Sequence, residues 1–121
     1  MGKIIIVDDE AKIRRTYSQF LTDEGFETIS CATVAQANEL LKAEPVDLVL
    51  LDIKMPEVSG DTLYHLVQLF HKQVKVIVTS VYSIDEQKEI INQAYDYYDK
   101  SQKTEILLEK VKSALNVKGG E

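Results

Sequence analysis

The sequence predicts an α/β fold in which five parallel strands alternate with five helices around a doubly wound sheet. Short apolar runs such as 4–7 and 46–51 indicate strands buried on both faces, as in parallel sheets. Between such runs lie longer segments whose apolar residues recur with the period of a helix. Right-handed crossovers between the strands then place helices on both faces of the sheet.

Three strands are expected in the first half of the chain. They cover residues 3–7, 26–31 and 46–51, and the second is more polar, as suits a strand near the edge of the sheet. The helix between the first two strands is expected over 11–24, and Gly25 suits the position just after its end. The inward face of this helix is formed by Ile13, Tyr17, Phe20 and Leu21.

The second helix has clear boundaries in the sequence. Thr33 and Gln36 have the spacing of a capping box at its start, and Pro45 ends it. Its apolar face carries Ala37, Leu40 and Leu41.

The second half of the chain continues the alternation. The fourth helix is expected to open at a capping box of Ser83 and Glu86 and to run to about Gln93. It offers only Ile84, Ile90, Ile91 and Ala94 to the core, so we expect it to be loosely anchored. The other elements are helices at about 61–72 (Leu63, Leu66, Val67 and Phe70 inward) and 103–116 (Leu107, Leu108, Val111 and Leu115 inward), and strands at 74–79 and 96–100.

Length and composition fit one globular domain. The 121 residues are expected to form a core over about 3–116, with 117–121 as a tail or the start of a linker. The first residues lack the basic and apolar regions of a signal peptide, no apolar stretch approaches the roughly 18 residues that span a membrane, and Cys31 is the single cysteine. These features favour a cytoplasmic protein. The net charge of −6 argues against direct nucleic-acid binding and is compatible with Mg²⁺ or a basic protein partner.

Polar residues gather where the strands of the predicted parallel sheet end. Asp8 and Asp9 follow the first strand, Asp52 the third, Ser80 the fourth and Lys100 the fifth, so all five converge on one edge. Two carboxylates about 5 Å apart repel by roughly 3 kcal/mol at an effective dielectric constant near 20. Three of them therefore require counter-charge, which Lys100 and a Mg²⁺ ion would supply.

This set of groups suits phosphoryl transfer to a carboxylate, a reaction that depends on positioning and charge neutralisation. Asp52 is the candidate nucleophile. Lys100 and Mg²⁺ would neutralise the phosphoryl oxygens, and Ser80 would donate a hydrogen bond to one of them.

Four ordered motifs in the chain resemble the receiver domain of bacterial two-component response regulators. They are Val7-Asp8-Asp9, Asp52-Ile53-Lys54-Met55-Pro56 with Gly60, Ser80, and Asp96-Tyr97-Tyr98-Asp99-Lys100. The resemblance covers residues 3–116 and implies a flavodoxin-like (βα)5 sheet with the strand order 2-1-3-4-5.

The resemblance also implies roles for these residues. Asp52 would accept the phosphoryl group from a sensor histidine kinase or a histidine phosphotransfer protein. Asp9 and Asp52 would bind Mg²⁺ directly, Asp8 mostly through water, and Lys54 through its backbone carbonyl. No turnover of an external substrate is expected, so the protein would act as a signalling domain rather than an enzyme.

The same resemblance implies that phosphorylation changes the conformation of the domain. Ser80 would turn toward the phosphoryl group, and Tyr97 would then move inward and remodel the surface formed by the fourth helix, fifth strand and fifth helix. A downstream effector, or a second copy in a phosphorylation-dependent homodimer, would recognise that surface. Lys54 and Tyr82 would line the path of the hydrolytic water, and their bulk and charge predict slow loss of the phosphoryl group.

Two positions depart from the family pattern. Ser101 follows Lys100 where the family usually has proline, and a cis bond without proline costs about 2.5–4 kcal/mol, so we expect a trans bond there. This substitution places the position of the Lys100 ammonium in question. Gln93 stands where the family often has glycine, so the turn before Ala94 is expected to differ.

Several of these polar residues also have a simpler structural interpretation when each is taken alone. Asp8 or Asp9 alone would serve equally well to cap the following helix. Cys31 is expected to be a small buried side chain, and His65 and His71 to be solvated on a helix away from the strand ends.

Other function classes fit the sequence less well. An aspartate-nucleophile phosphatase of the haloacid dehalogenase type would carry its Asp-x-Asp motif after the first strand, whereas Asp52 follows the third. A flavodoxin-like carrier of FMN would have Ser, Thr or Gly where Asp8, Asp9 and Glu10 stand. A receiver-like module that interacts without phosphorylation remains the alternative, because of Ser101.

Overall fold

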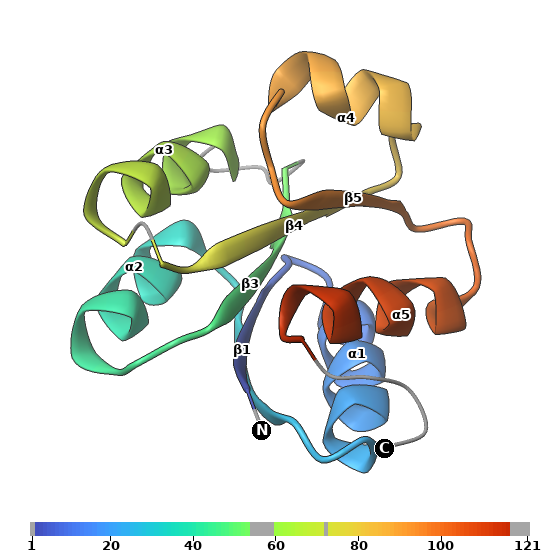
Figure 1. The fold of residues 1–121 in the computed structure, drawn as a ribbon, viewed down its shortest axis with the longest axis horizontal. Helices are drawn as coiled ribbons and strands as arrows, with labels where there is room; N and C mark the ends of the chain where they lie inside the picture. The colour runs from blue at the N-terminus through green and yellow to red at the C-terminus, as the bar shows by residue number, and fades with distance from the viewer. Residues whose placement is uncertain (1, 54–59, 72, 117–121) are drawn as a thin grey trace.

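The computed structural model describes residues 2–53, 60–71 and 73–116 (Figure 1). Five parallel strands form one sheet in the order β2-β1-β3-β4-β5, as expected from the receiver resemblance. The strands are β1 (Lys3–Val7), β2 (Glu27–Cys31), β3 (Leu48–Asp52), β4 (Lys75–Ser80) and β5 (Asp96–Asp99). The helices are α1 (Ala11–Asp23), α2 (Val34–Ala43), α3 (Gly60–Phe70), α4 (Ile84–Ile90) and α5 (Thr104–Ala114).

The sheet separates two helical layers, because successive strand side chains point to opposite faces. In β1, Ile4 and Ile6 pack with α1 and α5, whereas Ile5 and Val7 pack with α2 and α3. Figure 1 shows α1 and α5 together on one side of the sheet and α2 and α3 on the other. Both faces of the central strands are therefore buried, which explains their continuous apolar sequences.

The strand register brings the polar residues to one edge of the sheet. Val7 pairs with Leu51, so Asp8 and Asp52 follow in neighbouring positions as β1 and β3 end. Farther along the sheet, Ser80 pairs with Asp99, and Lys100 comes next.

The third strand starts two residues later than predicted. Asp47 was expected inside it, but its carboxylate accepts a hydrogen bond from the Lys3 backbone N–H at 2.9 Å. In a regular parallel ladder, the Lys3 backbone N–H would donate to a backbone carbonyl of β3. Because it donates to the Asp47 side chain instead, the regular pairing of β3 begins at Leu48.

The predicted helix ends are largely confirmed. Ser83 and Glu86 form a complete capping box on α4, and Thr33 caps α2 by accepting from the Gln36 backbone N–H at 3.2 Å. The Gln36 side chain reaches the backbone N–H of Ala32 rather than that of Thr33. Gly25 has φ 93°, the left-handed conformation expected after α1.

The predicted end of α4 and one residue of its inward face were wrong, whereas the other residues expected to face the core pack against it. The helix ends at Ile90 rather than near Gln93, because Ile91 adopts an extended conformation with φ −130° and ψ 107°. Ile90 is 48% exposed, whereas Gln87, which the apolar pattern had not selected, is fully buried. A polar side chain thus occupies the inward position on this helix.

The other helices show most of their expected faces. Tyr17 and Leu21 of α1, and Leu107 and Val111 of α5, are buried. In α3, Leu63 and Val67 are buried, while the side chains of Leu66 and Phe70 lie outside the described part, as does the tail 117–121. None of the described helices has the length and apolar character required to cross a membrane.

Candidate functional site

Three residues from distant parts of the chain meet at the carboxyl edge of the sheet. Asp8 and Asp52 are 1% and 2% exposed, respectively. The Lys100 ammonium lies 2.7 Å from Oδ2 of Asp8 and 3.3 Å from Oδ2 of Asp52. The predicted convergence of β1, β3 and β5 on one site is confirmed, and one cation is shared by two buried carboxylates.

The two carboxylates keep Lys100 charged despite its burial. Burial by itself lowers the pKa of the ammonium, but the hydrogen bond to Asp8 and the charge of Asp52 act in the opposite direction. The net result is a pKa above the ordinary value of 10.5. Lys100 is therefore a cation at neutral pH.

Asp9 and Glu10 extend the acidic edge. Asp8, Asp9 and Glu10 each place a carboxylate oxygen within 4.8 Å of the others, and Asp9 and Glu10 are exposed. Oδ1 of Asp8 accepts the backbone N–H of Glu10 at 2.9 Å, which holds this turn together. Glu10 was not among the predicted site residues, although three consecutive acids after a buried strand could have indicated that it belongs to this acidic group.

The charges at this edge suit a divalent cation. Four carboxylates lie there against two cations, the Lys100 ammonium and the Arg14 guanidinium, so the described side chains carry an excess of negative charge. Hard carboxylate oxygens are the ligands that Mg²⁺ prefers. Lys54, whose carbonyl was predicted to be a further ligand, lies outside the described residues.

Ser80 ends β4 beside this site. It is fully buried, and its Oγ accepts the backbone N–H of Tyr82 at 3.2 Å. Accepting that bond leaves the hydroxyl proton available for another acceptor. The Ser80 carbonyl accepts the backbone N–H of Lys100 at 2.8 Å, so the residues that end β4 and follow β5 are tied directly.

Tyr97 points inward, with 6% of its surface exposed. Its hydroxyl donates to the Ile91 carbonyl at 2.5 Å and accepts the backbone N–H of Ala94 at 3.1 Å. These two bonds satisfy backbone groups just beyond α4 and explain why the helix stops at Ile90. Tyr97 thus connects β5 to the end of α4.

The turn after Lys100 forms without proline. Asp99 accepts both the backbone N–H of Ser101, at 2.8 Å, and its hydroxyl, at 2.7 Å. These hydrogen bonds lower the pKa of the Asp99 carboxyl. The described residues contain no cis peptide bond, so the expected trans bond is confirmed, and Lys100 still reaches both carboxylates.

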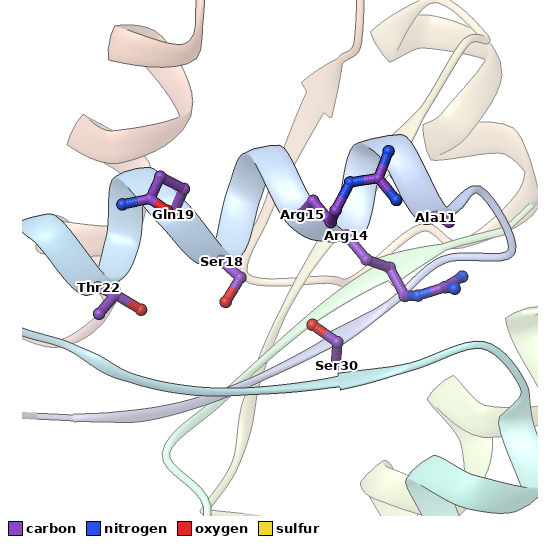
Figure 2. A pocket seen from close by; sticks show the side chains of 7 residues that line it. All are labelled: Ala11, Arg14, Arg15, Ser18, Gln19, Thr22 and Ser30. Atoms are coloured by element: carbon purple, nitrogen blue, oxygen red, sulfur yellow. The ribbon is translucent and has the colours of Figure 1, made fainter.

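A polar groove of about 450 Å³ runs beside the site between α1 and β2 (Figure 2). Ser18 and Ser30 face each other across it, and the Arg14 side chain extends toward its end while Arg15 points away from β2. Arg14 also donates to the Asp8 carbonyl at 2.6 Å. Arg14 therefore contacts both the groove and the acidic edge.

The cysteine and the two histidines are not among the proposed site residues. Cys31 is buried, and its burial raises the pKa of the thiol to about 11, so it is protonated and weakly nucleophilic at neutral pH. His65 is exposed, as expected, and His71 is half-buried just after α3.

Comparison with known proteins identifies the family. The sequence model described as "Response regulator receiver domain" matches residues 4–112. The chain belongs to the response regulator receiver family. Its members are the signalling domains of response regulators in two-component systems.

Individual relatives agree with this assignment. The chain is 34% identical to sporulation initiation phosphotransferase F of Bacillus subtilis over 92 residues, covering 73% of this chain and 74% of that protein. It is 35% identical to the response regulator protein PilR of Pseudomonas aeruginosa over 98% of this chain, but spans only 27% of PilR.

A solved structure is also similar. The response regulator TrrA of Thermotoga maritima, in complex with Mg²⁺-BeF, superposes with a TM-score of 0.86 at 32% identity, covering 94% of this chain and 99% of TrrA. The flavodoxin-like arrangement seen here is thus that of a receiver domain.

Proposed function

We propose that this receiver domain accepts a phosphoryl group on Asp52 in a Mg²⁺-dependent reaction. The observation that carries the proposal is the Lys100 ammonium held between the buried carboxylates of Asp8 and Asp52. A buried carboxylate with a fixed cation beside it, at an edge with excess negative charge, suits an anionic group arriving together with a metal ion. The acceptor oxygens are at the rim where strands of this topology place their ligands.

The phosphoryl donor is a phosphohistidine of a sensor kinase or a phosphotransfer protein. A carboxylate oxygen of Asp52 forms a bond to phosphorus as the bond from phosphorus to the histidine nitrogen breaks, and the electron pair stays on the imidazole. The Lys100 ammonium neutralises charge on the transferred group, and the Ser80 hydroxyl donates to one of its oxygens. The protein supplies position and charge, with little covalent chemistry of its own.

Mg²⁺ is supported by the donor set and by one relative. Asp8, Asp9 and Asp52 are the proposed ligands, with Glu10 adding negative charge nearby and Lys54 as a carbonyl ligand. When bound, the ion would supply charge neutralisation for the phosphoryl oxygens. The Thermotoga maritima relative was crystallised with Mg²⁺-BeF, which supports the same ion here.

The signal would leave through α4, β5 and α5. Ser80 and Tyr97 are the proposed switch residues. Ser80 ends β4 at the site, and the Tyr97 hydroxyl donates to the Ile91 carbonyl just after α4. Ile90 and Tyr95 are large apolar side chains exposed at 48% and 43% on this side of the molecule. They offer a surface for an effector or for a second phosphorylated copy.

The phosphorylated state is proposed to be long-lived. Tyr82 is half-buried two residues beyond Ser80, beside the proposed path of water, and Lys54 is the corresponding residue after Asp52. We expect Tyr82→Ala and Lys54→Asn to lose the phosphoryl group faster than wild type once the donor is removed. Intact mass against time measures this, and rapid loss from wild type that neither change alters would contradict it.

Intact mass after incubation with acetyl phosphate tests the proposed function. One phosphoryl group is expected on wild type with Mg²⁺, and none with a chelator or in Asp52→Asn. Absence of the adduct from folded, Mg²⁺-binding wild type would call for a phosphohistidine donor. Absence of both adduct and Mg²⁺ binding would favour the phosphate-independent interaction module.

A further inference from the structure

Gln87 is a fully buried polar side chain in a helix that contributes little else to the core. Its exposed fraction is 0%, and it is the one buried residue of α4. Burying an amide is unfavourable unless hydrogen bonds compensate for the loss of water. The partners of this amide therefore indicate what the position does.

The Gln87 amide nitrogen joins two segments that carry site residues. Nε2 donates to the carbonyl oxygens of Tyr82 and Tyr98, each at 2.9 Å. Tyr82 lies two residues after Ser80, and Tyr98 two residues before Lys100. One side chain of α4 thus holds the turn after β4 and the edge strand β5 at a fixed separation.

Burial alone does not explain why this position carries a glutamine. Oε1 of Gln87 has no hydrogen-bond partner among the residues that the structure describes. An unpaired buried acceptor is unfavourable, so this oxygen gives no advantage over an apolar side chain of similar length, such as methionine. The value of glutamine here lies in the two hydrogen bonds that its nitrogen donates.

We propose that Gln87 is a positioning residue that fixes the Ser80 turn relative to Lys100. The phosphoryl-transfer part of this inference rests on the proposed function, whereas the bridge itself does not. The acids of the β1–α1 turn lie outside the bridge, so they are expected to keep their positions when Gln87 is replaced. Loss of the bridge should loosen the Lys100 N–H to Ser80 carbonyl bond, which spans the two segments at 2.8 Å.

Amide hydrogen exchange tests the bridge directly. In Gln87→Met, we expect exchange at the Lys100 amide to rise at least about tenfold more than at the amides of β1, because only the bridged segments loosen. Gln87→Leu, which is apolar and donates no hydrogen bond, should act in the same direction. Gln68→Met, at an exposed glutamine of α3, is the matched control. Equal changes at Lys100 and in β1, or no change at either, would overturn the proposal.

Phosphorylation by acetyl phosphate tests the consequence for the reaction. We expect the rate in Gln87→Met to fall about 10- to 100-fold, since small misplacements of reacting groups have effects of that size. Mg²⁺ should still bind to the variant, because its carboxylate ligands are expected to keep their positions. A wild-type rate in a variant with fast Lys100 exchange would overturn the positioning role. If wild type takes no phosphoryl group either from acetyl phosphate or from a phosphohistidine donor, the proposed function fails, while hydrogen exchange still decides the bridge.

Discussion

At the scale of single residues, Lys100 holds together a set of charges that would otherwise repel. Its ammonium lies within 3.3 Å of both buried carboxylates, and neither Asp8 nor Asp52 can recover the solvation it lost on folding. Removing one member of a buried ionic group leaves its partners as uncompensated charges, which is strongly destabilising. Lys100 therefore contributes to stability as well as to the proposed chemistry.

Replacing Lys100 by methionine tests this directly. Without Mg²⁺ at neutral pH, we expect Lys100→Met to lower the free energy of unfolding by about 3 kcal/mol, and saturating Mg²⁺ to restore part of the loss. Urea unfolding with and without the ion gives both values. Lys12→Met, at an exposed lysine of α1, changes the net charge equally and is the control. Equal losses in the two variants would show that the ion pairs contribute no stability.

Sequence reasoning worked best for residues whose position follows from backbone topology. Asp8, Asp52 and Lys100 could be brought together because parallel strands end at one edge and because buried strands are easy to recognise. Glu10 and Gln87 were missed, since their roles depend on how a turn closes and on which carbonyls lie within reach. The trans turn at Ser101 was predicted from the cost of a cis bond, but its support by Asp99 was not.

At the scale of elements, α4 is the helix least secured by packing. It has seven residues, buries only Gln87, and is held at its ends by the Ser83 capping box and by the Tyr97 hydroxyl beyond it. The apolar pattern predicted a longer helix because it placed Ile90 and Ile91 on the same helix. In the structure the helix ends at Ile90, and Ile91 is extended. Weak anchoring is what an element with two packings of similar free energy requires.

The capping box provides a local test of this weak anchoring. We expect Ser83→Ala to destabilise α4 by about 1 kcal/mol, because the backbone N–H of Glu86 loses its partner. Amides of α4 should then exchange roughly fivefold faster, with little change in α5. Thr33→Ala removes the equivalent cap of α2 and should instead act on that helix. Faster exchange spread evenly over all helices would contradict a locally anchored α4.

At the scale of the whole molecule, the proposed metal-binding edge and the proposed output surface lie in different regions. The carboxyl edge gathers Asp8, Asp9, Glu10 and Asp52, while exposed apolar side chains lie around α4 and before β5. The two regions are joined through Ser80, Gln87 and Tyr97 by hydrogen bonds to backbone groups. These hydrogen bonds provide a continuous physical connection between the edge and the proposed output surface.

Mg²⁺ should stabilise the entire fold if the edge binds it. A ligand that binds only the folded state adds about 2.7 kcal/mol at a concentration 100 times its Kd, so Tm should rise with Mg²⁺ and fall again with chelator. Asp9→Asn should reduce this rise, whereas Glu109→Gln, an exposed acid of α5, should not. Thermal unfolding followed by circular dichroism provides the measurement. Identical Mg²⁺ responses in the two variants would place the ion elsewhere.

Borohydride reduction shows whether Asp52 becomes an acyl phosphate. The reagent converts a phosphorylated aspartate to homoserine and leaves a free carboxylate unchanged, so peptide mass spectrometry after treatment locates the modified residue. After phosphorylation with Mg²⁺, we predict homoserine at position 52 and an unchanged aspartate at positions 8 and 9. Homoserine at another position, or a stable phosphoryl group with Asp52 unreduced, would contradict the account.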